Sequence, residues 1–251
     1  MDIETVDHAL RNPFGLEGIR MLVAGAGGGI GAAAVQVCAE QGAEIVLADV
    51  VAEDAARQAI GAAAARMPYH RVDTSDRAAV TALAESIGPV DALIDASGIS
   101  PLDDWESEDW DAAFDRVIGV NLRGPINLAR AFMPGMIAAG HGRIVLTGSV
   151  SGRMGGIKCG PHYAASKGGI QSLTRWLAQK GIRHNVLVNA VAPGSIATPM
   201  AAAMRIDPAL YPQGRAGRPR EMGATMAFLC SPGAGFISGT VIDVNGGTYF
   251  G

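Results

Sequence analysis

The sequence predicts a doubly wound α/β fold, a mostly seven-stranded parallel sheet with helices on both faces. Short apolar runs alternate with helix-like stretches along the chain, which is typical of right-handed crossover units. Several of these runs are continuously apolar, as strands covered on both faces are. No linker, repeat or change of composition divides the chain, so we expect a single domain over residues 17–251, preceded by a loosely attached N-terminal leader, residues 1–16.

The expected strands are the apolar runs, and glycine-rich or polar turns separate them from the helices. We expect strands at 19–25, 43–50, 69–73, 90–98, 142–149, 186–194 and 239–247. We expect helices at 31–42, 52–67, 75–88, 120–140, 163–181 and 219–231, and we assign no element to the Trp-containing segment before residue 120. Glycine, at 34 residues, is nearly twice its ordinary frequency, which indicates many tight turns.

The composition excludes several classes of protein. Hydrophobic residues make up 49% and charged residues 18% of the chain, so we expect a sizeable core. A net charge of −4 without basic runs gives nucleic-acid binding little support. Three widely spaced cysteines (Cys38, Cys159 and Cys230) favour neither a disulfide framework nor a metal site. With no signal peptide and no membrane span in the sequence, we expect a cytoplasmic protein without a metal, nucleic-acid or membrane partner.

The first strand-to-helix turn, in LVAGAGGGIGAAAV, is rich in glycine. Gly25, Gly29 and Gly31 allow the backbone to turn sharply and to approach a pyrophosphate at the helix N-terminus. The second strand ends in Asp49, eighteen residues after Gly31, where a carboxylate can accept hydrogen bonds from an adenosine ribose. Because this carboxylate repels a 2′-phosphate, and Val50 rather than a basic residue follows it, the turn favours NAD over NADP. A solvated strand end is the alternative role for Asp49.

The stretch PHYAASKGG, residues 161–169, sets Tyr163 and Lys167 four residues apart. In a helix these positions lie on one face, so the phenol and the ammonium can share a site. An ordinary surface pair has the same spacing, so partners are needed. Ser149 follows the strand at 142–149, at the carboxyl edge where doubly wound sheets bind ligands.

Taken together, these motifs resemble the short-chain dehydrogenase/reductase family, from about residue 17 to the C-terminus, with its Rossmann fold. The matching pieces, in order, are GAGGGIG, Asp49, Asp73, ASG at 96–98, Asn121, Ser149, YAASK, PGSIAT and VNGG. The resemblance implies that Tyr163 is the general acid/base. A free phenol titrates near pH 10, so action near neutrality needs about 4 kcal/mol, which Lys167 helps to supply. It also implies that Ser149 holds the substrate oxygen and that Asn121 anchors a water leading to Lys167.

The resemblance also implies a set of cofactor contacts. Asp73 is expected at the adenine, and the segment 193–198 at the carboxamide. The full expected set is Gly25, Gly28, Gly29, Ile30, Gly31, Asp49, Val50, Asp73, Ala96, Ser97, Gly98, Tyr163, Lys167, Pro193, Gly194, Ile196 and Thr198. Ser151 is the alternative to Ser149, and an N-cap is the alternative role for Thr198. Ala24 and Asp95 depart from the family, which has threonine and asparagine there, and we expect these departures to alter hydrogen bonding at the sheet edge.

The substrate pocket is expected from the loops at the strand ends, 99–105, 151–162 and 195–211. Its candidate residues are Ser100, Met154, Cys159, His162 and Met200. The apolar residues Met200, Met204, Ile206, Leu210 and Tyr211 form either a lid or a helix-packing stripe.

We therefore expect an NAD-dependent oxidoreductase that transfers a hydride between a secondary alcohol, or its ketone, and nicotinamide. The alternatives are a reductase of ketones or 3-oxoacyl thioesters and a non-catalytic NAD(H)-binding regulator. The resemblance implies a homotetramer, or a homodimer, with the helices around 115–138 and 161–181 at the interface.

Overall fold

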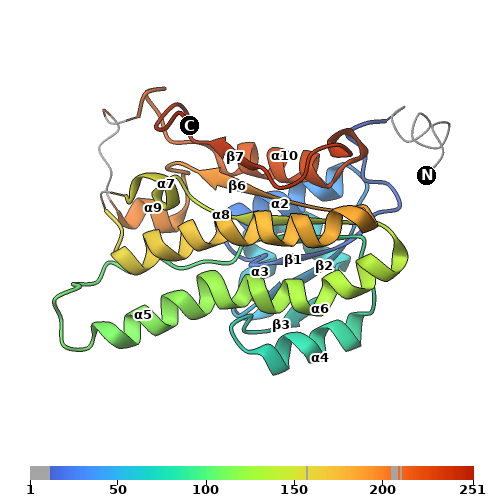
Figure 1. Ribbon diagram of the computed structural model, residues 1–251, viewed down its shortest axis with the longest axis horizontal. Coiled ribbons are helices and arrows are strands. Elements are labelled where there is room, and N and C mark those ends of the chain that lie inside the picture. Colours follow the sequence, from blue (N-terminus) through green and yellow to red (C-terminus); the bar gives the residue numbers. More distant parts are fainter. Residues whose placement is uncertain (1–11, 157, 205–208, 210) are drawn as a thin grey trace.

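The computed structural model describes residues 12–156, 158–204, 209 and 211–251. Its centre is a seven-stranded sheet in the order β3-β2-β1-β4-β5-β6-β7, with every neighbouring pair parallel (Figure 1). The strands are β1 (Arg20–Ala24), β2 (Glu44–Asp49), β3 (Tyr69–Arg71), β4 (Ala92–Asp95), β5 (Gly142–Thr147), β6 (Val186–Pro193) and β7 (Val241–Val244). The predicted doubly wound fold is confirmed.

Helices cover both faces of the sheet. On one face α2 (Gly29–Glu40) and α10 (Pro219–Cys230) pack against each other, and α3 (Glu53–Ile60) lies beside α2. The other face carries α4 (Arg77–Ile87), α6 (Gly124–Ala139) and α8 (Pro161–Gly181) (Figure 1). The shorter elements are α5 (Trp110–Ile118), α7 (Ser151–Met154), α9 (Pro199–Ala203), the 3₁₀ turns η1 (Gly61–Arg66), η3 (Ile182–His184) and η5 (Pro232–Ala234), and the π-helical turn η2 (Gly119–Arg123).

Each central strand contributes to two cores. In β1, Met21 and Val23 join the core under α2 and α10, while Leu22 and Ala24 join the core under α6 and α8. These four side chains are fully buried. Successive strand residues point to opposite faces, so a strand covered on both sides must be apolar throughout. This explains the continuous apolar runs.

Two helices differ from the expected ranges. The long helix expected at 120–140 begins earlier, because α5 starts at Trp110 and continues through η2 into α6. The helix expected at 52–67 ends as an α-helix at Ile60, where Gly61 takes a φ of 80° and the chain tightens into η1. Glycine adopts such positive φ values without strain, so it ends a helix readily.

The described part of the expected leader, residues 12–16, packs against the body of the protein. Leu16 is fully buried and its N–H donates to the carbonyl of Gln41 at 2.8 Å. The ring of Phe14 lies 6.1 Å from that of Phe228. This stretch is therefore not loosely attached as we expected. Within the described ranges, no helix has both the length and the apolar content to cross a membrane.

Candidate active site

The residues expected to carry the chemistry meet at the carboxyl edge of the sheet. Ser149 follows the end of β5, and the first turns of α8 present Tyr163 and Lys167 to it. All three line one cavity of about 350 Å³. The Lys167 Nζ lies 5.8 Å from the centre of the Tyr163 ring. The helical spacing therefore places the phenol and the ammonium in one site, as the sequence predicts.

The electrostatic environment of Tyr163 is set by burial and by Ser149. Burial, the larger effect, raises the pKa of the Tyr163 phenol, and a hydrogen bond with the Ser149 side chain lowers it. The net pKa lies above the usual value for tyrosine. The expected effect of Lys167 on this pKa stays a prediction, whereas the Ser149 hydroxyl lowers it in the structure. It also accepts a hydrogen bond from Ser151 N at 3.1 Å.

Lys167 is 3% exposed, and its Nζ donates to the carbonyl of Thr147 at 2.8 Å. Burial lowers its pKa to about 8, and the carboxylate of Asp95 opposes that shift. An amine with this pKa is largely protonated at neutral pH and can exchange a proton near the working pH of most enzymes. Thr147 and Asp95 were not among the expected site residues. Their contacts depend on how β4, β5 and α8 pack together, which the local sequence does not show.

Asn121 is fully buried in the π-helical turn η2, a type of turn frequent at functional sites. Its Oδ1 accepts from Ile99 N at 2.8 Å, and its Nδ2 donates to Ile99 O at 2.9 Å and to Ser166 Oγ at 3.2 Å. The Ser166 hydroxyl in turn donates to the carbonyl of Tyr163 at 2.7 Å. Asn121 therefore joins the loop after β4 to the helix that carries Tyr163.

The glycine turn between β1 and α2 is shaped to admit a phosphate group. Gly25 has a φ of 72°, and a side chain there would meet the backbone N of Ser97 at 2.5 Å. The N-cap of α2 is Gly28, which has no side chain to cap the free N–H groups. A Cβ on Gly29 would lie 2.7 Å from Thr198 Cγ2. This narrow, uncapped helix N-terminus fits the pyrophosphate of a dinucleotide.

The carboxylate of Asp49 lies beside this turn. Its Oδ2 accepts from Gly27 N at 2.7 Å, and its Oδ1 accepts from Val50 N at 2.7 Å. Val50 is 55% exposed. The sequence suggests no basic residue near Asp49, but the sheet register pairs Asp49 with Arg71, whose Nε donates to Val50 O at 3.0 Å. A basic side chain therefore does lie next to the expected ribose site.

Most of the remaining expected cofactor residues lie at the cavity that holds the catalytic candidates. Eight of them line the 350 Å³ cavity beside the catalytic candidates: Ile30, Ala96, Ser97, Gly98, Pro193, Gly194, Ile196 and Thr198. Thr198 is the N-cap of α9 and its Oγ1 accepts from Ala201 N at 3.3 Å, which is the alternative role noted above. Asp73 is exposed and its Oδ1 accepts from Ser75 N and Oγ at 2.9 and 2.7 Å.

Of the expected substrate residues, Met154, Cys159 and Met200 line the cavity, as do Met204 and Tyr211. Ile206 and Leu210 lie outside the described residues. Ser100 and His162 are not among the lining residues. The side chain of His162 is fully buried, and its Nε2 lies 2.9 Å from Asp103 Oδ2. Its Nδ1 accepts from Tyr163 N at 3.0 Å, so His162 connects the loop after β4 to the start of α8.

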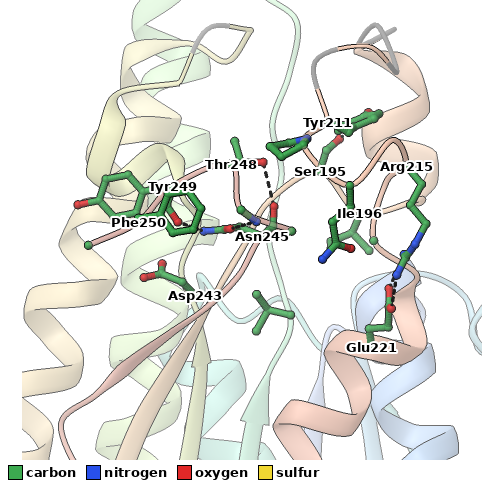
Figure 2. Close-up of a pocket in the computed structure, with 17 residues that line it drawn as sticks. Ser195, Ile196, Tyr211, Arg215, Glu221, Asp243, Asn245, Thr248, Tyr249 and Phe250 are labelled. Atoms are coloured by element: carbon green, nitrogen blue, oxygen red, sulfur yellow. Dashed lines mark hydrogen bonds and ion pairs between the residues drawn. The ribbon is translucent and has the colours of Figure 1, made fainter.

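A second cavity of about 610 Å³ adjoins the first at the C-terminal end of the chain (Figure 2). The two share Ser195, Ile196, Tyr211 and Thr248 among their lining residues. The hydroxyl of Tyr211 lies 3.0 Å from Ser195 Oγ. The ion pair of Arg215 with Glu221 lines the side of the cavity opposite Tyr249 (Figure 2). Tyr211 lies in the stretch 195–211 expected to line the pocket, whereas Thr248 was missed as a site residue because nothing in its local sequence points to the cavity.

Comparison with known proteins gives close matches over almost the whole chain. A family model described as Enoyl-(Acyl carrier protein) reductase matches residues 25–249. Galactitol 2-dehydrogenase (L-tagatose-forming) from Cereibacter sphaeroides is 40% identical over 94% of this chain and 97% of its own. The 3-oxoacyl-(acyl-carrier-protein) reductase from Thermotoga maritima is 34% identical over 92% of this chain and 98% of its own.

Solved structures agree with these matches. A 3-oxoacyl-(acyl-carrier protein) reductase with bound NAD from Brucella melitensis has a TM-score of 0.85 at 33% identity, covering 100% of this chain and 97% of that one. A putative NAD(P) dependent gluconate 5-dehydrogenase from Beutenbergia cavernae, with bound NADP, has a TM-score of 0.86 at 32% identity, covering 94% and 99%.

Proposed function

The chain belongs to the short-chain dehydrogenase/reductase family, and on that premise we propose that it oxidises a secondary alcohol with NAD, using Tyr163 as the general acid/base. Its family makes it an oxidoreductase acting between an alcohol or ketone and a nicotinamide cofactor. The observation that carries the proposal is the single cavity shared by Ser149, Tyr163 and Lys167.

In this proposal each side chain has one task. The Ser149 hydroxyl holds the substrate oxygen by a hydrogen bond, and the Tyr163 oxygen takes the proton of the substrate hydroxyl, or returns it when a ketone is reduced. The Lys167 ammonium favours the ionised phenol through its charge. Asn121 keeps the loop after β4 against α8 and, as expected from the family, anchors a water on the proton path. The cofactor, when bound, supplies the hydride acceptor or donor.

The cofactor is proposed to lie along the glycine turn, with its pyrophosphate at the N-terminus of α2 and its ribose at Asp49. The uncapped N–H groups of this helix and the close approach of Gly29 to Thr198 support that placement. The charge of Asp49 favours the unphosphorylated ribose of NAD. Arg71 favours NADP instead, and solved relatives hold either cofactor. We propose NAD because the Asp49 carboxylate faces the turn directly.

The substrate is proposed to be a small secondary alcohol. Met154, Met200 and Met204 line the cavity together with Tyr163, and flexible methionines accommodate varied apolar shapes. The relative that acts on galactitol supports an alcohol substrate. The second candidate is reduction of a 3-oxoacyl thioester, which the match to the reductase of Thermotoga maritima favours. A regulator that binds NAD(H) without turnover is the remaining alternative.

We also propose a homotetramer in the cytoplasm. Phe114 on α5 and Trp176 on α8 are 38% and 60% exposed, and large apolar side chains at the surface are common at subunit interfaces. Light scattering on the purified protein tests the mass of the oligomer.

The proposed cytoplasmic location is supported by the free state of all three cysteines, which is typical of a reducing compartment.

The test is formation of NADH from NAD across aliphatic, cyclic, aromatic, polyol and 3-hydroxyacyl alcohols, with NADP in parallel. A preferred alcohol with NAD supports the proposal and gives the substrate class. Faster turnover with NADP would refute the cofactor assignment alone. No turnover with any alcohol, on a sample that binds NADH by fluorescence titration, would favour the regulator.

A further inference from the structure

Side chains bind both polar groups of the Tyr163 backbone. The Tyr163 N–H donates to His162 Nδ1 at 3.0 Å and also to the carbonyl of Gly160 at 3.1 Å. The Tyr163 carbonyl accepts from Ser166 Oγ at 2.7 Å. The contact with Ser166 belongs to the Asn121 network described above. The contact with His162 is the one that the proposed mechanism does not use.

The imidazole of His162 is also bound on its other side. Its Nε2 lies 2.9 Å from Oδ2 of Asp103, a residue of the loop after β4. The side chain of His162 is fully buried, and that of Asp103 is 19% exposed. The ring of Trp110 in α5 lies 5.3 Å from the imidazole. The other carboxylate oxygen, Asp103 Oδ1, is buried without a hydrogen-bond partner among the described residues, so the imidazole is the partner that holds this side chain.

These two contacts fix which ring nitrogen of His162 carries the proton. A backbone N–H can only donate, so Nδ1 must offer its lone pair to Tyr163 N. The proton of the neutral imidazole then lies on Nε2, which donates it to the carboxylate of Asp103. Asp103 therefore stabilises the tautomer that can accept the Tyr163 N–H. An imidazole bound at both nitrogens has a single orientation.

The helix that carries Tyr163 depends on this pair at its start. Its N-cap is Gly160, which has no side chain to bond the free N–H groups of the first turn, and Pro161 follows it. A Cβ on Gly160 would clash with the imidazole of His162 and would lie 3.3 Å from Asp103 Oδ1. The partial positive charge of a helix N-terminus favours a carboxylate at this place. The imidazole and the carboxylate therefore take the part that a polar N-cap side chain has in other helices.

We propose that His162 is a positioning residue for catalysis: Asp103 orients its imidazole, which fixes the backbone of Tyr163 and thereby the place of the phenol in the cavity. This inference rests on the proposed role of Tyr163 as the general acid/base. His162 is not among the residues that line the cavity, so it acts through Tyr163 and not on the substrate. The effect on the rate is large, because a displacement of about 1 Å in a catalytic group can cost about 100-fold.

The experiment compares wild type with His162→Asn and His162→Leu in the oxidation of the best alcohol. Asparagine keeps an acceptor near the place of Nδ1, whereas leucine has no acceptor and fills more of the buried space. Both variants lose the bond to Asp103, so that loss cancels between them. We expect kcat to fall about tenfold or more in His162→Leu and several-fold less in His162→Asn. The KM for the alcohol and the Kd for NADH should change little in either variant.

A purely structural role predicts the opposite order of the two variants. A buried leucine packs against the Trp110 ring, whereas an asparagine leaves a cavity and an unpaired amide. A kcat in His162→Leu equal to or above that of His162→Asn would therefore overturn the inference, as would a rise in KM without a fall in kcat. The matched control is His141→Leu, at the exposed histidine that lies 2.7 Å from Asp91. It should keep the kcat of wild type.

Two further measurements keep the inference testable if the His162 variants do not fold. Asp103→Leu removes the group that orients the imidazole, so its kcat should fall several-fold with the Kd for NADH unchanged, and a wild-type kcat would refute the inference. A nitrogen NMR spectrum of wild type with isotope-labelled histidine should show the His162 proton on Nε2 alone, and a proton on Nδ1 would also refute it. These outcomes are separate from the proposed function, which fails if Tyr163→Phe retains turnover.

Discussion

The Lys167 ammonium lies 5.8 Å from the centre of the Tyr163 ring, one helical turn away along α8. Its hydrogen bond to the carbonyl of Thr147 holds it against the end of β5, so the amine cannot swing away from the phenol without leaving that buried bond unmade. The geometry explains why a lysine is needed here, since a shorter side chain could not reach both the strand end and the phenol.

Lys167 should make the stability of the protein depend on pH. Its pKa is lowered from 10.5 to about 8 in the folded chain, so between these values the unfolded state binds more protons. The free energy of unfolding should therefore rise with pH in this window, by about 1.4 kcal/mol per unit at most. Urea unfolding of wild type and Lys167→Met at pH 7.5 and 9.5 measures it. The wild type should gain roughly 2 kcal/mol relative to the variant, and a constant difference would contradict the burial argument.

Asp49 and Arg71 should set the choice of cofactor. Asp49→Asn removes the charge that repels a 2′-phosphate, so the Kd for NADPH should fall by about tenfold while that for NADH rises. Arg71→Gln should have the opposite effect on NADPH and little effect on NADH. Fluorescence titration of both cofactors with both variants measures the ratio. A Kd ratio unchanged in Asp49→Asn would remove Asp49 from the ribose site.

Gly25 should tolerate no side chain. Gly25→Ala places a Cβ 2.5 Å from Ser97 N at a φ of 72°, so both strain and a backbone clash oppose folding. Thermal unfolding should show a loss of several degrees. Gly135→Ala is the control, because Gly135 lies in α6 with nothing within 4 Å of the added Cβ. It should be neutral or stabilising by about 0.5–1 kcal/mol, and equal effects of the two changes would contradict this reasoning.

The buried pair of His162 and Asp103 should matter far more than an exposed pair of the same kind. His162→Ala opens a cavity and leaves Asp103 without its partner, which should cost about 2–4 kcal/mol and lower Tm by several degrees. The exposed pair of His141 and Asp91 has a slightly shorter distance, 2.7 Å against 2.9 Å, with the histidine side chain 50% exposed. His141→Ala should change stability by less than about 1 kcal/mol. Calorimetry of the two variants tests the contrast.

A feature of the site could be predicted from the sequence where it depends on residues that lie close together along the chain. The meeting of Ser149, Tyr163 and Lys167 could be predicted, because helical spacing and the position of strand ends fix it within short stretches. The approach of Arg71 to Val50 could not, since it depends on the register between β2 and β3. The burial of His162 was missed for a similar reason, because its partner Asp103 lies 59 positions away.

The most direct test of the central claim is the turnover of Tyr163→Phe with the best alcohol, together with its affinity for NADH. Phenylalanine keeps the ring and removes only the hydroxyl that is proposed to carry the proton. The account predicts a fall in kcat of about 1,000-fold or more, with NADH binding within a few-fold of wild type. Turnover within about tenfold of wild type on the same sample would show that another group moves the proton and would contradict the account.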